Sequence, residues 1–285
     1  MNKTDSFDEF LDEVDYDYSI NEHYIRNDEE FEELLLKPYL DEGRRIFYRG
    51  ESIVSMKRPL LPTMYRQRSN FLKEDEEFTD IDAGRLFEHY REKGDYLNLY
   101  NSVFGSAEKE HMYDLCAFSQ HYLNDSPLID FSKSLYAALS FGLKGRHSFE
   151  DDALLYTIEI YDPNKYTDRK ETADVWLNGY HVRICRNSDH SLRSSSPDAM
   201  IIDIATNDLM KYQQGVFLLL DDFDLVNRFY LTKNVRSSVS FGKFILDKEY
   251  CPRIEERIEA EAPWYVFDRL LNISSGLKEA IDHKK

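Results

Sequence analysis

The sequence predicts an α+β fold: a single compact domain with a mixed or antiparallel sheet core, helices inserted in the N-terminal half and a helical C-terminal cap. Three observations predict it. Helical periodicity dominates the first half, short β-branched and aromatic runs dominate the second, and the tail becomes helical again. With 285 residues, 42% of them hydrophobic, the chain is long enough to bury a substantial core.

The N-terminal half begins with an acidic arm, residues 1–43, which we separate from a main domain at 44–285. Within the arm, "DEEFEELLLKPYL" (28–40) predicts a helix that ends before Gly43. Its expected apolar face is Phe31, Leu34 and Leu35. Next, "RRIFYRG" (44–50) alternates as a strand does.

The remaining elements follow from the same two periodicities. Helices are expected at 71–92 and 107–122, and "KSLYAALSF" (133–141) predicts a small-residue helix that packs closely on a sheet. Strands are expected at 153–161, 199–204, 215–222 and 238–246. The tail is helical and broken at Pro263, whereas 163–198 is polar and irregular.

Charge and composition exclude several classes of function. The formal net charge is -18, which repels phosphate backbones, so we expect no general nucleic-acid binding. No apolar run approaches the roughly 20 residues of a membrane span. Three scattered cysteines form no zinc or disulfide pattern, so we expect no metal and a cytoplasmic location.

Three motifs are not explained by core filling. In "FYRG", Tyr48, Arg49 and Gly50 end a strand, where a rigid arginine can bind a diphosphate or carboxylate and a glycine allows close approach. A surface arginine at a turn is the alternative. The other two motifs lie at 120–142 and 211–220.

The second motif, "QHYLNDSPLIDFSKSLYAALSFG", places Asp130 and Ser132 between an apolar strand and a helix N-terminus, which favours an anion or a capping hydroxyl. Ser132 is the expected N-cap, and His121 lies at the end of the preceding helix, where a cation near the C-terminus is favoured. The third motif, "KYQQGVFLLL", places Gln213 and Gln214 before a strand, where their amides can bind sugar hydroxyls or satisfy a turn. Capping explains Asp130 and Ser132 without any ligand.

In this order, the motifs resemble the FRG domain family, named for its Phe/Tyr-Arg-Gly motif. Members continue with a segment close to Q-H-Y-G-L-P-T-R-L-L-D-W-T, to which residues 120–132 align without a gap. A late Q-x-G-x-F element is similar to 213–217, so that the resemblance spans roughly 44–283. The usual Thr-Arg of the family is Ser126-Pro127 here, and Arg183 or Arg186 can stand in for the missing arginine.

The motif order also resembles that of arginine-specific ADP-ribosyltransferases. The resemblance implies that Arg49, Asp130 and Gln214 are catalytic and that Tyr48, Gly50, His121, Ser132 and Gln213 bind NAD, the implied substrate. These transferases use a glutamate before the late strand, and none stands beside Gln213. Proteins of this kind act as toxins or antiviral effectors on a protein target.

Three hypotheses remain open. The first is an NAD-consuming or ADP-ribosyl-transferring enzyme, and the second is a non-catalytic ligand-binding or sensor module that acts through a protein or operon partner. The third is a nuclease, for which Asp198 and "DDFD" (221–224) are the nearest candidates for metal ligands. No paired acid-and-lysine spacing follows them, and the net charge of -18 opposes binding to a nucleic acid.

Overall fold

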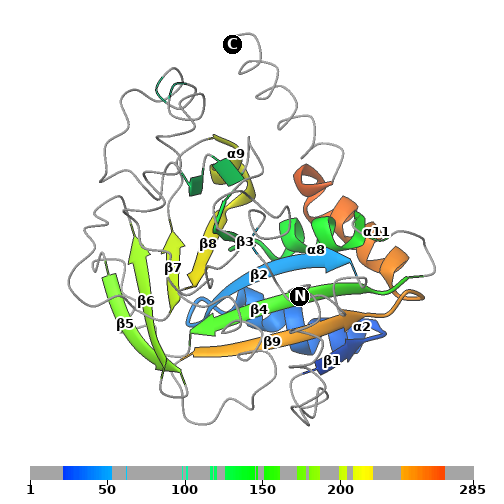
Figure 1. The fold of residues 1–285 in the computed structure, drawn as a ribbon. Helices are drawn as coiled ribbons and strands as arrows, with labels where there is room; N and C mark the ends of the chain where they lie inside the picture. The colour runs from blue at the N-terminus through cyan, green and yellow to red at the C-terminus, as the bar shows by residue number, and fades with distance from the viewer. Residues whose placement is uncertain are drawn as a thin grey trace, which may run out of the picture.

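The computed structural model describes residues 22–52, 62, 98, 101, 116–117, 119–120, 126–144, 146, 151–160, 172–177, 180–186, 199–203, 208–220 and 239–266. This part of the chain is an α+β domain built on one nine-stranded sheet (Figure 1). The strand order is β1-β9-β4-β2-β3-β8-β7-β6-β5.

The sheet is mixed, as expected. Its strands are β1 (Glu22–Ile25), β2 (Arg45–Ser52), β3 (Ile129–Ser132), β4 (Ala153–Ile160), β5 (Thr172–Leu177), β6 (Tyr180–Arg186), β7 (Ala199–Asp203), β8 (Gly215–Leu220) and β9 (Val239–Leu246). β1 runs parallel to β9 and β6 parallel to β7, whereas the other neighbours are antiparallel. The expected strands at 44–50, 153–161, 199–204, 215–222 and 238–246 are confirmed.

The sheet consists of two halves with a weak joint between them. β2 pairs with β4 along its whole length, but with β3 only through Tyr48 and Ser132. Figure 1 shows that β2, β4 and β9 run across the molecule, whereas β8, β7 and β6 cross that direction at a steep angle. The chain therefore needs side-chain contacts to hold β2 against β3.

Helix α8 (Leu135–Lys144) covers one face of β2 and β4 and is almost wholly buried. The close approach depends on two glycines. A Cβ at Gly50 would lie 1.8 Å from the carbonyl oxygen of Ala138, and one at Gly142 would lie 3.2 Å from that of Leu154. The sequence predicted this small-residue packing, and the structure shows that Gly50 is the residue that admits the helix.

The expected helix at 28–40 is confirmed as α2 (Asp28–Phe31), a π-helical turn η1 (Glu32–Leu36) and α3 (Lys37–Leu40). Asn27 caps it by accepting a 2.9 Å bond from the backbone N–H of Glu30. Phe31 and Leu35 are buried as predicted, but Leu34 is 38% exposed and Leu36 is buried instead. The wider π turn alters the 3.6-residue register on which the prediction rested.

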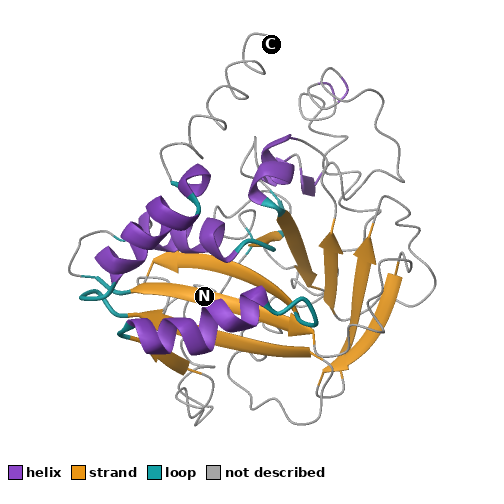
Figure 2. Ribbon diagram, turned by 180° about the vertical axis from the view of Figure 1, so that it is seen from behind, coloured by secondary structure: helices purple, strands orange, loops and turns teal. Residues whose placement is uncertain are grey.

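Helix α11 (Cys251–Glu261) and the short turn η5 (Pro263–Tyr265) form the predicted C-terminal cap. The helix ends just before Pro263, as expected. Figure 2 shows α11, α8 and the α2–α3 segment on the same face of the sheet half that contains β4. Arg257 joins α11 to the N-terminal segment by an ion pair with Glu32.

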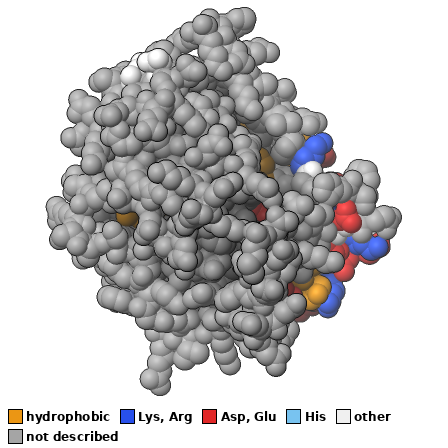
Figure 3. Space-filling view, viewed as in Figure 1, with side chains coloured by type: hydrophobic (Ala, Val, Ile, Leu, Met, Phe, Trp, Pro, Cys, Tyr) orange, Lys and Arg blue, Asp and Glu red, His pale blue; other side chains and the backbone are white. Residues whose placement is uncertain are grey.

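The residues of the acidic arm that the structure describes belong to the domain, because β1 lies at the sheet edge and α2 packs beside α11. Figure 3 shows basic and acidic side chains interspersed on this side of the molecule. Arg253, for example, lies 3.7 Å from Asp28 and 2.9 Å from Glu256. Short exposed pairs of this kind contribute little each, so β pairing and apolar burial attach the segment.

Two expectations were incomplete. The polar stretch 163–198 contains the antiparallel pair β5 and β6, which its composition did not predict. The expected helix at 71–92 lies outside the described residues. Within 107–122, residues 116–117 and 119–120 are helical, and Cys116 and Ser119 are buried. Among the described residues no helix is long and apolar enough to cross a membrane.

Candidate functional site

Arg49 is a partly buried residue of β2 that forms an ion pair along its own strand. Residues two apart on a strand point to the same face. The guanidinium accordingly meets Glu51, with 2.7 Å from Nε to Oε1 and 2.5 Å from Nη2. The two side chains are only 14% and 10% exposed. Much of the arginine's hydrogen-bonding capacity is therefore used inside the protein.

The same guanidinium crosses the joint between the sheet halves. Its Nη1 donates to the backbone carbonyl oxygen of Asp130 at 2.8 Å and lies 3.9 Å from Asp130 Oδ2. From the other side, Gln120 Nε2 donates to Oδ2 at 2.6 Å. We call Arg49, Glu51, Gln120 and Asp130 the junction cluster.

One atom of the junction cluster lacks a hydrogen bond. Asp130 Oδ1 is buried and has no hydrogen-bond partner among the described residues. A buried carboxylate oxygen without a donor costs free energy, because it has given up water and gained nothing. This oxygen is therefore a place where a hydroxyl or amide of a ligand, or a water molecule, can donate.

The charge of the cluster is unbalanced in the acidic direction. With both carboxylates ionised, Arg49 neutralises one of the two and a net charge of about -1 remains. Burial alone would lower the pKa of Arg49, but the carboxylates of Glu51 and then Asp130 raise it, so the guanidinium stays charged. Taken by themselves, these four side chains favour a cationic or hydrogen-bond-donating group over an anion. In the described part of the chain, no group of three His, Cys, Asp or Glu residues could hold a metal ion.

Tyr48 and Gly50 lie on the other face of β2, because neighbouring strand residues alternate. Gly50 contacts α8, as described above. The Tyr48 ring packs edge-on against Tyr39, with centroids 6.0 Å apart, and burial raises the pKa of its phenol. The side chain of Arg49 therefore lies on one face of the sheet, and Tyr48 and Gly50 of the same motif pack on the other.

The end of β3 is hydrogen-bonded to the turn that follows α9 (Asp208–Gln213). The residues that make these contacts include Ser132, Gln213 and Gln214. Ser132 Oγ donates to the carbonyl oxygen of Gln213 at 2.6 Å, and the N–H of Lys133 donates to that of Gln214 at 3.0 Å. Gln214 has a positive φ of 52°. Its side-chain amide donates to Tyr265 Oη at 3.1 Å, so it contacts the C-terminal cap.

The predicted N-cap is wrong by two residues. Ser132 still belongs to β3, and its hydroxyl accepts a bond from the N–H of Ser134 at 2.9 Å. The hydroxyl of Ser134 accepts from the N–H of Ala137 at 3.2 Å, which is the capping bond of α8. Ser132 is therefore the last residue of β3, and the helix begins after Ser134.

Of the predicted site residues, the structure brings Arg49 and Asp130 into contact. His121 lies outside the described residues. Arg183 and Arg186 lie on β6, which is separated from β3 by β8 and β7, and their side chains are outside the described part. The prediction missed Glu51, although the Arg-x-Glu spacing on a predicted strand indicates a shared face.

Comparison with known protein families supports one of the two resemblances that the sequence motifs indicated. Residues 44–151 match the model of the FRG domain family, and this segment includes every member of the junction cluster. No curated protein and no solved structure matches the chain. These comparisons give no support to the resemblance to ADP-ribosyltransferases. Residues 44–151 are therefore similar to an FRG domain, in agreement with the motifs.

Proposed function

We propose that the junction cluster binds the nicotinamide ribose of NAD and that the chain is an ADP-ribosyltransferase-like or NAD-consuming enzyme. The observation that carries the proposal is Asp130 Oδ1, a buried carboxylate oxygen with no donor in the described part of the chain. A ribose hydroxyl is a donor of the right kind for it.

The chemistry explains why acids should outnumber bases there. When the bond between ribose C1′ and the nicotinamide nitrogen breaks, its electron pair leaves with nicotinamide and positive charge develops on the ribose. A fixed negative charge nearby stabilises that charge, as in glycoside hydrolysis. Water, or a nucleophile of a target protein, then bonds to C1′ and releases a proton.

The proposal changes the role expected for Arg49. Its guanidinium is already engaged by Glu51 and by the Asp130 carbonyl oxygen. Arg49 is therefore a positioning residue that holds two carboxylates in place, and the diphosphate of NAD would be bound elsewhere. The glutamate that is absent beside Gln213 is replaced in this proposal by the charges of Asp130 and Glu51.

The test measures nicotinamide release from NAD by wild type and by the variant Asp130→Asn, with candidate protein targets present and absent. Loss of a transition-state electrostatic contact predicts a fall of about 10²–10³-fold in rate. Asp247→Asn is the matched control, because this carboxylate accepts a bond from the N–H of Glu249 outside the junction cluster and its replacement should leave the rate within about threefold of wild type. No release by wild type, with or without targets, contradicts the proposal.

A second candidate is a non-catalytic ligand-binding or sensor module. It is favoured by the engagement of Arg49 within the chain, which leaves the cluster without an evident anion-binding group. Calorimetry separates the two: NAD or a related nucleoside that binds without turnover, with affinity reduced in Asp130→Asn, supports the module. As an enzyme the chain would suit a toxin or an antiviral defence effector, and its expression should then lower cellular NAD.

A further inference from the structure

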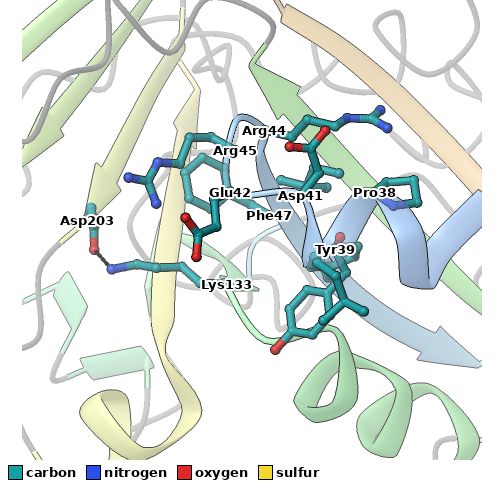
Figure 4. Close-up of a pocket in the computed structure, with 12 residues that line it drawn as sticks. Pro38, Tyr39, Asp41, Glu42, Arg44, Arg45, Phe47, Lys133 and Asp203 are labelled. Atoms are coloured by element: carbon teal, nitrogen blue, oxygen red, sulfur yellow. Dashed lines mark ion pairs between the residues drawn. The ribbon is translucent and has the colours of Figure 1, made fainter.

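A hollow of about 570 Å³ lies at the joint between the two halves of the sheet. One wall belongs to the half that contains β4, and is formed by the end of α3, the turn that follows it and residues 44–48 around the start of β2. The other wall is formed by Lys133, next to β3, and Asp203 of β7, which belong to the half that contains β8 (Figure 4). Along this stretch the halves face a hollow instead of a packed interface.

Two ion pairs at the walls of the hollow each lie within one half. Arg44 pairs with Glu159 and so joins the start of β2 to β4. Lys133 lies 2.6 Å from Asp203 and joins the end of β3 to β7, as the dashed line in Figure 4 shows. β2 is also paired with β4 along its whole length, and all of β3 is paired with β8. Each half is thus held together internally, and β2 and β3 belong to different halves.

Two sets of side-chain contacts span the joint, one on each face of β2. On the face away from α8, Arg49 donates to the carbonyl oxygen of Asp130. On the α8 side, the η5 turn connects α8 with the turn after α9. Ser140 Oγ of α8 donates to the carbonyl oxygen of Tyr265 at 2.6 Å, and the Gln214 amide donates to Tyr265 Oη at 3.1 Å.

The Tyr265 ring also packs against Tyr212 of α9, with ring centroids 5.9 Å apart. We call these contacts of Tyr265 with Ser140, Gln214 and Tyr212 the η5 clasp. Gln214 is exposed and has a φ of 52°, a left-handed conformation that is unfavourable for a residue with a Cβ. Two hydrogen bonds and one ring contact are few enough to open while both halves stay folded.

We infer that the two halves of the sheet are joined by a hinge at the Tyr48–Ser132 pair and that the η5 clasp keeps this hinge closed. In the closed form Asp130 Oδ1 is buried and out of reach of a ligand. Release of the clasp lets the halves separate at the hollow, which breaks the Arg49 contact and uncovers Oδ1. The clasp is therefore autoinhibitory for the site proposed above, a role that rests on the proposed function, whereas the hinge itself does not depend on what that site binds.

The experiment measures the distance between two spin labels, attached at Lys211→Cys on α9 and Glu259→Cys on α11. These positions are exposed and lie on different halves. Cys185→Ser prevents a third label, because Cys116 and Cys251 are buried. Double electron–electron resonance should give one main distance for this labelled parent chain, which corresponds to the closed hinge.

Tyr265→Leu removes both the hydroxyl and the ring, and should raise the fraction of longer distances by about tenfold or more. Tyr265→Phe removes the hydroxyl alone and should raise that fraction by about 2- to 10-fold. Addition of Arg49→Ala to Tyr265→Phe should make the open form the major one, since the contact on the other face is then lost as well. Tyr250→Phe is the matched control: it removes a hydroxyl that donates to Asp28 at 2.6 Å within one half, and the distances should stay as in the parent.

Parent-like distances in Tyr265→Leu and in the double variant, with circular dichroism showing folded protein, overturn the hinge. If Tyr265→Leu does not fold, Tyr265→Phe decides in its place. An equal shift in Tyr250→Phe also overturns the hinge, because the change would then be a general loosening. The measurement needs no NAD, so longer distances in a chain that releases no nicotinamide support the hinge and contradict only the proposed function.

Discussion

The guanidinium of Arg49 on β2 donates to the backbone carbonyl oxygen of Asp130 on β3 at 2.8 Å, across the joint between the two halves of the sheet. The backbone joins these strands only through Tyr48 and Ser132. Arg49 therefore replaces ladder hydrogen bonds that the diverging strands cannot make. At the same time it holds Glu51 beside a carboxylate that has an unpaired oxygen.

Arg49→Ala should lower the free energy of unfolding by about 3 kcal/mol, because it removes the cation that pairs with the largely buried Glu51 and breaks the contact to β3. Urea unfolding followed by circular dichroism measures it. Glu51→Gln should cost less, since the amide can still accept a bond from the guanidinium.

The double variant Arg49→Met with Glu51→Leu is the decisive control. Replacement of both partners of a buried ion pair by apolar residues is often nearly neutral, so the double variant should be more stable than Arg49→Ala. If the separate effects of Arg49→Met and Glu51→Leu simply add in the double variant, the two side chains do not interact in solution.

Much of the fold could be predicted from periodicity. The alternating runs of the sequence predicted β2 and β4, and the small residues at helical spacing predicted α8. These elements bury continuous apolar faces, so their patterns are clear in the sequence. β5 and β6 were not predicted, because the stretch 163–198 is polar as a whole and hides two short runs, "TADVWL" and "YHVRICR", that are rich in β-branched and aromatic residues. Leu36 is buried in place of the predicted Leu34, because the π-helical turn breaks the 3.6-residue period that the prediction assumed.

The candidate site could be predicted only in part. Arg49 and Glu51 are two apart on a strand, so their contact follows from the sequence. The contact of Gln214 with Tyr265 does not, because it depends on how the C-terminal cap folds back from 51 residues later in the chain. The spacing of residues in the sequence indicates which side chains share a face of a strand or helix. Which residues of other elements they contact depends on the tertiary packing.

Gly50→Ala should destabilise the protein by about 3 kcal/mol or more, because the added Cβ would lie 1.8 Å from the Ala138 carbonyl oxygen and α8 must move. Gly215→Ala is the matched control on β8, where the nearest atom, Met210 O, would be 3.6 Å away. Thermal unfolding compares the two. Equal midpoints would show that α8 does not pack on β2 as closely as described.

Ser134→Ala should cost about 1 kcal/mol through loss of the cap of α8. Ser132→Ala removes a different pair of bonds, one from the Ser134 N–H and one to the carbonyl oxygen of Gln213. Hydrogen exchange distinguishes them: Ser134→Ala should speed exchange of amides in the first turn of α8, whereas Ser132→Ala should speed it in the turn at Gln214. The reverse pattern would restore Ser132 as the N-cap.

Stability should fall steeply above pH 10. Burial is the largest cause of the raised pKa of Tyr48 and of Tyr156, whose ordinary value is 10.0. The folded state therefore keeps phenol protons that the unfolded state releases. The contribution of each buried phenol to the free energy of unfolding is full below pH 10 and is lost as the pH rises toward the pKa of the folded state. For each tyrosine, the free energy of unfolding then falls by up to about 1.4 kcal/mol per pH unit.

Urea unfolding at pH 8, 10 and 11 measures this slope, and Tyr48→Phe and Tyr156→Phe should each reduce it because phenylalanine has no proton to release. Phe241→Leu is the matched control, since it changes a buried ring that carries no titratable proton, and it should lower the stability by the same amount at each pH. Curves for Tyr48→Phe that run parallel to wild type would mean that the Tyr48 phenol reaches solvent. The Tyr48 hydroxyl, which has no hydrogen-bond partner among the described residues, would then be hydrated.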